Sequence, residues 1–193
     1  MDRRAFLGGT AAALGAAVLD SALSQNTDYA NEPIAGGGPL TPPADRKINV
    51  AFLIAEGANV IDLAGAWEVF QDVHVPGRGD SMDELMPFRL YTVAATKAPI
   101  TATGGLRIVP NYSFDDAPPP DLVSVGAQRG SKAGLAWLAA IAPTTDVTMS
   151  VCTGAYQLAR AGLLDGLTAT THHDFYDDFA QSFPEVRVQR GLR

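Results

Sequence analysis

The sequence predicts an α/β domain built on a mostly parallel β-sheet. Residues 48–55 are a near-continuous apolar run, which is typical of a strand buried on both faces of a parallel sheet, and residues 121–125 are interpreted as a second buried strand. Elsewhere in the chain, apolar residues recur at helical spacing. A third strand-like run, residues 147–151, passes directly into such a helix, and Cys152 stands at the junction. We therefore expect strands and helices to alternate along the chain.

Composition and charge limit the classes of function. The chain has 193 residues, of which 47% are hydrophobic and 18% charged, which suits one globular domain with a sizeable core. The formal net charge of −7 argues against nucleic-acid binding by this chain, because phosphate contacts need a basic face. The single cysteine cannot form an internal disulfide. Beyond the first 24 residues no apolar run is long enough to span a membrane.

The N-terminus has the order of features of an export signal. Arg3-Arg4 is followed by Phe and Leu, as in a twin-arginine signal, and then by an apolar run over residues 11–19 that is too short for a membrane span. Small residues at 22–24 offer a cleavage site. The alternative is an ordinary amphipathic helix. We expect residues 1–24 to be a twin-arginine signal peptide, the mature protein to be periplasmic or secreted, and no membrane contact after signal removal.

The domain should begin after a linker. Residues 25–46 are rich in Gly, Pro, Asn and Asp and lack periodicity, which is typical of a linker. The first strand is then expected from Lys47 onward. A turn containing Glu56, which we expect to be solvated, leads to a helix that Asp62 opens. An aspartate at a helix start usually serves as a cap.

The other elements follow from the same two periodicities. Gly104-Gly105 and short alternating segments predict a small antiparallel excursion over residues 100–112. The remaining expected elements are a strand over residues 88–94, a helix over 132–142, a helix from 155 onward, a short strand over 167–171 and a helix over 174–183.

Cys152 is the first candidate for chemistry. A residue between a strand and the next helix projects above the carboxyl edge of the sheet, near unpaired helix N–H groups that favour an anion. This placement predicts a reactive thiolate on a nucleophile elbow, built with Cys in place of Ser. The alternative is a small buried apolar residue, a common role for a lone cysteine.

The segment around the cysteine resembles the ThiJ/PfpI superfamily, which has a class I glutamine amidotransferase-like fold. The similarity covers residues 48–190 and is closest to isonitrile hydratases and the sensor domains of AraC-type regulators. The residues that carry it are Ser150-Val151-Cys152-Thr153-Gly154-Ala155, Leu158-Ala159, Ala161-Gly162-Leu163-Leu164-Asp165-Gly166 and Ala169-Thr170-Thr171-His172.

The resemblance implies a flavodoxin-like three-layer sandwich with a mostly parallel sheet and a Cys nucleophile elbow. In the family a further strand and a closing helix follow the segment that ends this chain. Residues 47–193 are therefore expected to be a ThiJ/PfpI-like domain that lacks its C-terminal elements. A homodimer is expected of the full-length form.

The family's pattern also implies site residues. Asp62 matches an acidic residue that reaches the cysteine, where it could pass a proton to sulfur or to substrate, and His172 matches the family's histidine. A turn at Gly126 and Ala127 and the N–H of Thr153 match backbone donors of an oxyanion hole. Ala127 stands where the family has a second glycine, which puts that role in doubt.

Two kinds of chemistry are not expected. Adjacent histidines point in opposite directions on a strand, so His172 and His173 are not expected to form a metal pair, and no nearby residue completes a zinc site. We therefore expect no metal and no cofactor. Peptidase members of the superfamily carry His directly after Cys, and Thr153 in that place argues against a protease.

The function implied is that of an exported, cysteine-dependent protein acting on a small molecule. The resemblance points first to hydration of isonitriles to N-substituted formamides. One alternative is a glyoxalase or deglycase that acts on reactive carbonyls. Another is a non-catalytic domain that senses a small molecule or oxidation, because an elbow thiolate is readily oxidised.

Overall fold

The computed structural model describes residue 43 and residues 45–191. The predicted signal peptide, residues 1–24, and all but a few residues of the predicted linker, 25–46, lie outside this part of the chain. Within the part described, no helix is both long and apolar enough to cross a membrane.

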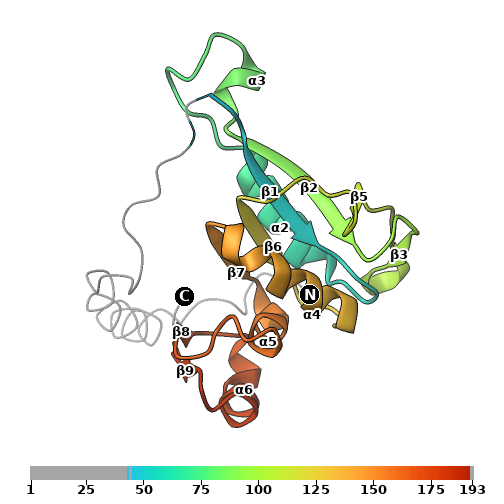
Figure 1. Cartoon of the computed structure of the whole chain (residues 1–193), viewed down its shortest axis with the longest axis vertical. Coiled ribbons are helices and arrows are strands. Elements are labelled where there is room, and N and C mark those ends of the chain that lie inside the picture. Colours follow the sequence, from blue (N-terminus) through green and yellow to red (C-terminus); the bar gives the residue numbers. More distant parts are fainter. Residues whose placement is uncertain (1–42, 44, 192–193) are drawn as a thin grey trace, which may run out of the picture. The chain divides into compact units, whose positions relative to one another are not determined.

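The central sheet has five strands, all parallel, in the order β5-β2-β1-β6-β7 (Figure 1). The apolar run at residues 48–55 forms the central strand, in which Val50 and Ala51 are fully buried. The predicted parallel sheet is confirmed. Its strands are β1 (Ile48–Leu53), β2 (Phe88–Ala94), β5 (Tyr112–Ser113), β6 (Leu122–Val125) and β7 (Val147–Ser150).

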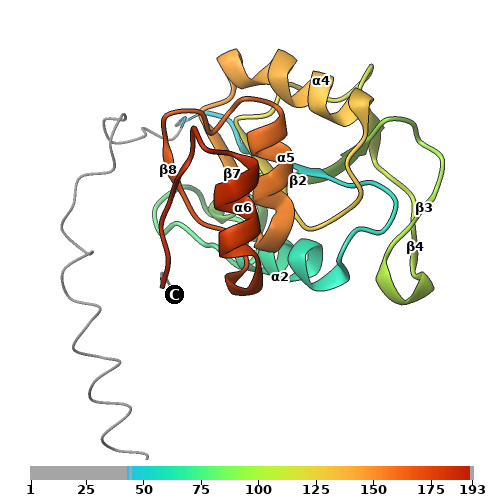
Figure 2. The ribbon, with the colours of Figure 1, turned by 90° about the horizontal axis from the view of Figure 1, so that it is seen from below.

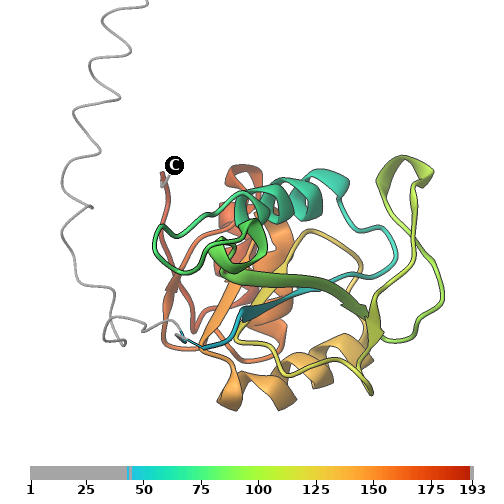
Figure 3. The same ribbon diagram turned by 90° about the horizontal axis from the view of Figure 1, so that it is seen from above.

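Helices cover both faces of the sheet, which confirms the three-layer arrangement (Figures 2 and 3). Helix α2 (Val60–Gln71) lies on one face, where the ring of Phe52 packs 5.2 Å from that of Trp67. Helices α4 (Lys132–Ile141) and α5 (Ala155–Arg160) cover the other. There the buried side chains of alternate strand residues pack against the helices; this core includes Ala51, Leu53, Tyr91, Val93, Val123, Val125, Trp137, Leu138 and Leu158.

The remaining strands and helices are short and lie outside the central sheet. The predicted antiparallel excursion is the hairpin of β3 (Ile100–Thr101) and β4 (Arg107–Ile108). Strands β8 (Thr168–Ala169) and β9 (Arg187–Val188) pair separately and in parallel. The other elements are the helices α3 (Met82–Leu85) and α6 (Tyr176–Ser182) and the 3₁₀-helices η1 (Thr103–Gly105), η2 (Ala142–Thr144), η3 (Cys152–Gly154) and η4 (His173–Phe175).

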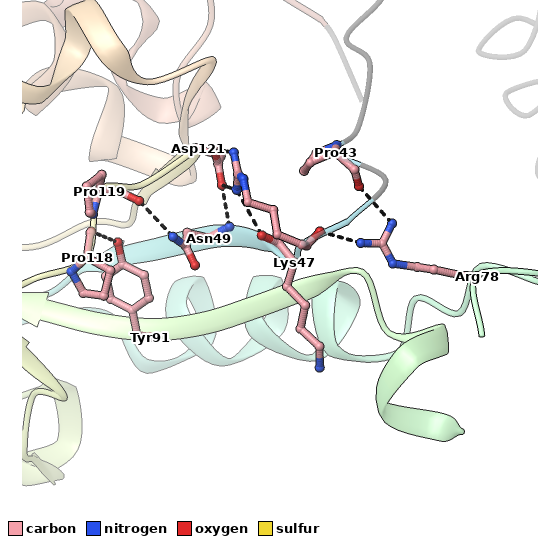
Figure 4. Close-up of polar contacts among 9 residues, drawn as sticks. Pro43, Lys47, Asn49, Arg78, Tyr91, Pro118, Pro119 and Asp121 are labelled. Atoms are coloured by element: carbon pink, nitrogen blue, oxygen red, sulfur yellow. Dashed lines mark hydrogen bonds and ion pairs between the residues drawn. The ribbon is translucent and has the colours of Figure 1, made fainter. Parts of the chain in front are cut away.

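Asp121, just before β6, joins the start of the domain to the sheet (Figure 4). Its carboxylate accepts two hydrogen bonds from the Arg46 guanidinium, at 2.6 and 2.7 Å, and one from the backbone N–H of Asn49 at 2.8 Å. Nearby, the Tyr91 hydroxyl donates to the Pro118 carbonyl at 2.6 Å, and burial raises the pKa of Tyr91 to about 12. Arg46, predicted to be the last linker residue, is thus attached to the domain.

We expect Asp121→Ala to lower the free energy of unfolding by about 1–3 kcal/mol, because the Asn49 N–H loses its carboxylate acceptor and Arg46 its partner. The hydrogen bond from Arg46 lowers the pKa of Asp121 below its ordinary value. This contribution is therefore complete above about pH 4 and is lost as the pH falls through the lowered pKa. Urea unfolding at pH 7 and in more acidic buffer measures it.

Asp83→Ala is the matched control, because Asp83 pairs with Lys47 but its side chain is 83% exposed. Equal losses in the two variants at pH 7 would contradict a special role for Asp121.

Candidate functional site

Cys152 occupies a strained turn between β7 and α5. Its φ of 56° makes it the one non-glycine residue with a positive φ in the part of the chain described. This left-handed conformation costs about 1–2 kcal/mol for a residue with a Cβ. The residue opens the 3₁₀-helix η3, which leads into α5. The predicted nucleophile elbow is therefore present in the backbone.

Close packing against the end of β6 holds this turn. A Cβ on the buried Gly154 would lie 1.9 Å from the Val125 carbonyl oxygen, so only glycine fits. That oxygen also accepts the Val151 N–H at 2.9 Å. On the other side of the turn, the Thr171 hydroxyl donates to the Cys152 carbonyl at 3.2 Å. The elbow is thus fixed to the sheet by its backbone.

The cysteine faces a cavity of about 560 Å³. Cys152 is half-buried and lines this cavity, so the residue is not enclosed in the hydrophobic core. His172, His173 and Tyr176 line the same cavity, and so does Thr170, whose buried hydroxyl oxygen has no hydrogen-bond partner among residues 45–191. The structure therefore brings the predicted Cys152 and His172 to one cavity.

Asp62 does not cap its helix. The cap of α2 is Asn59, whose side chain accepts the N–H of Ile61, and the helix begins two residues before Asp62. Asp62 points inward, is 6% exposed, and accepts the Ala127 N–H through Oδ2 at 2.9 Å. Its Cβ lies 2.9 Å from the place of a Cβ on Gly126, which explains the glycine there.

Asp62 and the elbow meet through the turn after β6. Both Asp62 and Gly154 pack against Gly126, but among residues 45–191 no hydrogen bond joins Cys152 to Asp62 or to His172. Asp62 instead lines a separate small hollow of about 10 Å³. Proton transfer between Asp62 and the thiol therefore stays a prediction.

The predicted oxyanion donors differ in their present hydrogen bonding. The Ala127 N–H is already bonded to Asp62. The N–H of Thr153, in the turn that follows the sulfur-bearing residue, has no acceptor within the residues described. The N–H of Gly126 likewise has no acceptor within the residues described, so Gly126 and Thr153 are the predicted donors that are not already bonded.

The prediction that adjacent histidines point apart is wrong. Strand β8 ends before His172, which precedes the 3₁₀-helix η4, so the alternation of a strand does not apply. The two imidazole rings lie 4.3 Å apart and 30° from parallel. His172, His173 and Asp174 each offer a ligand atom, all within 4.8 Å of one another. The argument against a metal pair therefore fails, and the absence of a metal stays a prediction.

The tautomer of His172 follows from its local contact. The Asp174 backbone N–H donates to Nδ1 of His172 at 3.3 Å. An imidazole that accepts at Nδ1 carries its proton on Nε2 when neutral. His172 is then a hydrogen-bond donor through Nε2.

Sequence reasoning missed several residues of this site, among them Thr170, Thr171 and Tyr176. Thr171 holds the carbonyl of the elbow, and Tyr176 lines the cavity. Thr171 directly precedes the predicted His172, and Tyr176 lies in the helix predicted over residues 174–183. Their place in the chain was the only signal for these two residues.

A family model described as "DJ-1/PfpI family" matches residues 48–188. The chain belongs to this family. The match covers the whole sheet and all the predicted site residues.

Three relatives illustrate the range of the family. The chain is 32% identical over 161 residues to the HTH-type transcriptional regulator GbdR of Pseudomonas aeruginosa, covering 80% of this chain and 42% of the regulator. It is 27% identical over 136 residues to isonitrile hydratase of Pseudomonas putida, covering 67% and 54%. A ThiJ/PfpI family structure from Pseudomonas syringae superposes with a TM-score of 0.60 at 26% identity, covering 86% and 67%. The chain thus spans about half the length of these curated relatives.

We expect Gly154→Ala to destabilise the fold by at least about 3 kcal/mol, because the new methyl group would overlap a backbone oxygen that cannot move without the sheet. Urea unfolding of the wild type and the variant measures the loss.

Gly65→Ala is the matched control, since the nearest atom to its new Cβ is 4.0 Å away in the middle of α2. This change should stabilise the protein by about 0.5–1 kcal/mol. A Gly154→Ala protein as stable as the wild type would show that the elbow is not packed as described.

Proposed function

We propose that the chain is a cysteine-dependent enzyme that hydrates isonitriles to N-substituted formamides. The observation that carries this is the left-handed backbone of Cys152, which presents the thiol to a cavity at the carboxyl edge of the sheet. The similarity to isonitrile hydratase supports the choice of substrate class.

The reaction would proceed through one covalent intermediate. The thiolate of Cys152 adds to the terminal carbon of the isonitrile, and that carbon takes a proton to give a thioimidate. Water then adds to the same carbon, a proton moves to nitrogen, and the carbon–sulfur bond breaks. Isonitrile and water are consumed, the formamide leaves, and the thiolate is regenerated.

Three groups would assist the thiol. Asp62 is proposed to supply and recover the protons, from its place beside the Gly126 turn. His172 lines the cavity and would donate through Nε2 to the substrate nitrogen or to water. The free N–H of Thr153 would stabilise negative charge that develops as water adds.

We expect the wild type to convert an alkyl isonitrile to its formamide and Cys152→Ala to have no activity above background. Asp62→Asn keeps an acceptor for the Ala127 N–H but cannot exchange a proton, so it should lower kcat by about 10²–10⁴-fold. Gas chromatography of the formamide gives both rates.

His74→Ala is the control, because His74 is exposed and, within the part of the chain described, its ring contacts the Asp72 carbonyl alone through a hydrogen bond. Absence of turnover by the wild type, or full activity of Cys152→Ala, would reject the assignment. Consumption of methylglyoxal in place of the isonitrile would point instead to a glyoxalase or deglycase.

The second candidate is a sensor domain without turnover, favoured by the 32% identity to a transcriptional regulator across 80% of the chain. In this case the elbow thiol would bind a ligand or be oxidised. Intact-mass analysis after mild peroxide should then show a gain of two oxygen atoms that Cys152→Ala lacks, in a protein inactive toward isonitriles.

We also propose export by the twin-arginine route, which rests on Arg3-Arg4 and the apolar run after it. Cell fractionation should find the wild type in the periplasm or medium, and a variant with both arginines changed to lysine in the cytoplasm.

A further inference from the structure

A second cavity, of about 310 Å³, lies at the carboxyl ends of β1, β2 and β6. It shares no lining residue with the cavity of Cys152. After β1 the chain winds to β2 on one side and later to β6 on the other, so the order in which strands are added reverses at β1. Open α/β sheets bind ligands at the carboxyl ends of strands at such a reversal. Its volume is at the lower end of that of small-molecule sites, roughly 300–1,000 Å³.

The floor of this cavity holds a buried amide with an unused acceptor. Gln157 of α5 is 3% exposed and lines the cavity. Its Nε2 donates to the Gln128 carbonyl at 3.2 Å, which fixes the orientation of the amide. Its Oε1 accepts no hydrogen bond within the part of the chain described, and it lies 3.4 Å from the place of a Cβ on Gly130. The oxygen is not among the fully buried atoms of the residues described, so it is open to a donor from a ligand or from water in the cavity.

A second amide on the same wall is in a different state. Gln128 donates its Nε2 to the Leu53 carbonyl at 2.9 Å, and its Oε1 is fully buried, with no hydrogen-bond partner among the residues described. The acceptor oxygen that a ligand in the cavity can meet on this wall is therefore that of Gln157. A ligand that carries N–H groups would complement this wall better than one that offers only acceptors.

Two charged side chains, Glu56 and Arg129, line the cavity. The exposed Glu56 carboxylate accepts the Thr101 N–H, at 3.2 Å from each oxygen, and retains capacity for further donors. The stem of Arg129 lies beside Gly57. The rest of the wall is mainly apolar and includes Ile100 and Phe114. A negative and a positive group beside an apolar hollow suit a zwitterion with an apolar side chain.

We propose that this cavity binds a small apolar α-amino acid. Its ammonium group faces Gln157 and Glu56, its carboxylate faces Arg129, and its side chain lies against Ile100 and Phe114. The site is independent of the thiol chemistry proposed above, because none of these residues lines the cavity of Cys152.

Isothermal titration calorimetry with three matched probes tests the proposal on the full chain. L-Leucine carries all three features, 3-methylbutylamine lacks the carboxylate, and 4-methylpentanoate lacks the ammonium group. We expect leucine to bind most tightly, the amine more weakly, and the carboxylate not at all. Equal binding of leucine and 4-methylpentanoate, or no binding of leucine, would overturn the proposal.

Two variants locate the site. Gln157→Leu removes the amide acceptor on the cavity floor, and Glu56→Gln removes the charge while keeping an acceptor for the Thr101 N–H. Each should weaken leucine binding by about tenfold or more, because a hydrogen bond to an ammonium group is lost or loses its charge. Glu56 is exposed, so that variant should fold even if Gln157→Leu does not. Wild-type affinity in Glu56→Gln would contradict the assignment.

Cys152→Ala separates the two proposals. Leucine binding should persist in this variant whether or not the wild type hydrates isonitriles. Loss of leucine binding in Cys152→Ala would show that the ligand occupies the cysteine cavity and would overturn the second site.

Discussion

The contact between the backbone of Gly154 and the Val125 carbonyl oxygen determines where the thiol lies. The oxygen belongs to the end of β6, next to the central strand, and it leaves no room for a side chain. Gly154 is packed against the sheet, and two residues before it Cys152 takes the left-handed conformation. The strain at one residue is balanced by packing and hydrogen bonds at its neighbours, which is usual at functional turns. The same end of β6 then continues into Gly126, which packs against Asp62.

Much of the fold could be predicted because its strands are buried on both faces. A near-continuous apolar run located β1, the run at residues 121–125 located β6, and helical spacing located α4 almost to the residue. The wrong prediction came from applying the side-chain alternation of a strand to residues that lie outside the strand. The histidines were assigned the alternation of a strand, but β8 has only two residues, and the chain turns so that Thr171 can bond the elbow. Attachment of Arg46 depends on Asp121, 75 residues away, and local composition carries no signal for such a pair.

The site could be predicted only in part, for a related reason. The family resemblance identified Asp62 as a site residue. Its side chain can point inward because Asn59 caps the helix and the N–H of Ala127, in a distant turn, donates to its carboxylate. The spacing of apolar residues in α2 predicts neither the cap nor this hydrogen bond. Gln157 did leave a signal, since it is a polar residue among Ala155, Leu158 and Ala159 in a segment that must pack on the sheet. A polar side chain in that setting is either satisfied by the fold or kept for a ligand, and its Oε1 accepts nothing within residues 45–191.

Helix α5 connects the two cavities. Its first residue follows the elbow directly, and its third, Gln157, forms part of the floor of the second cavity. The helix has only six residues and packs tightly, with Ala155 and Leu158 almost completely buried. A ligand that draws on Gln157 therefore acts on the same rigid segment that positions the thiol, because a packed core transmits small shifts and does not absorb them. An enzyme and a sensor would use this segment differently: one needs it fixed during turnover, and the other needs two arrangements whose balance a ligand changes. The rigidity of α5 thus bears directly on which of the two functions the elbow serves.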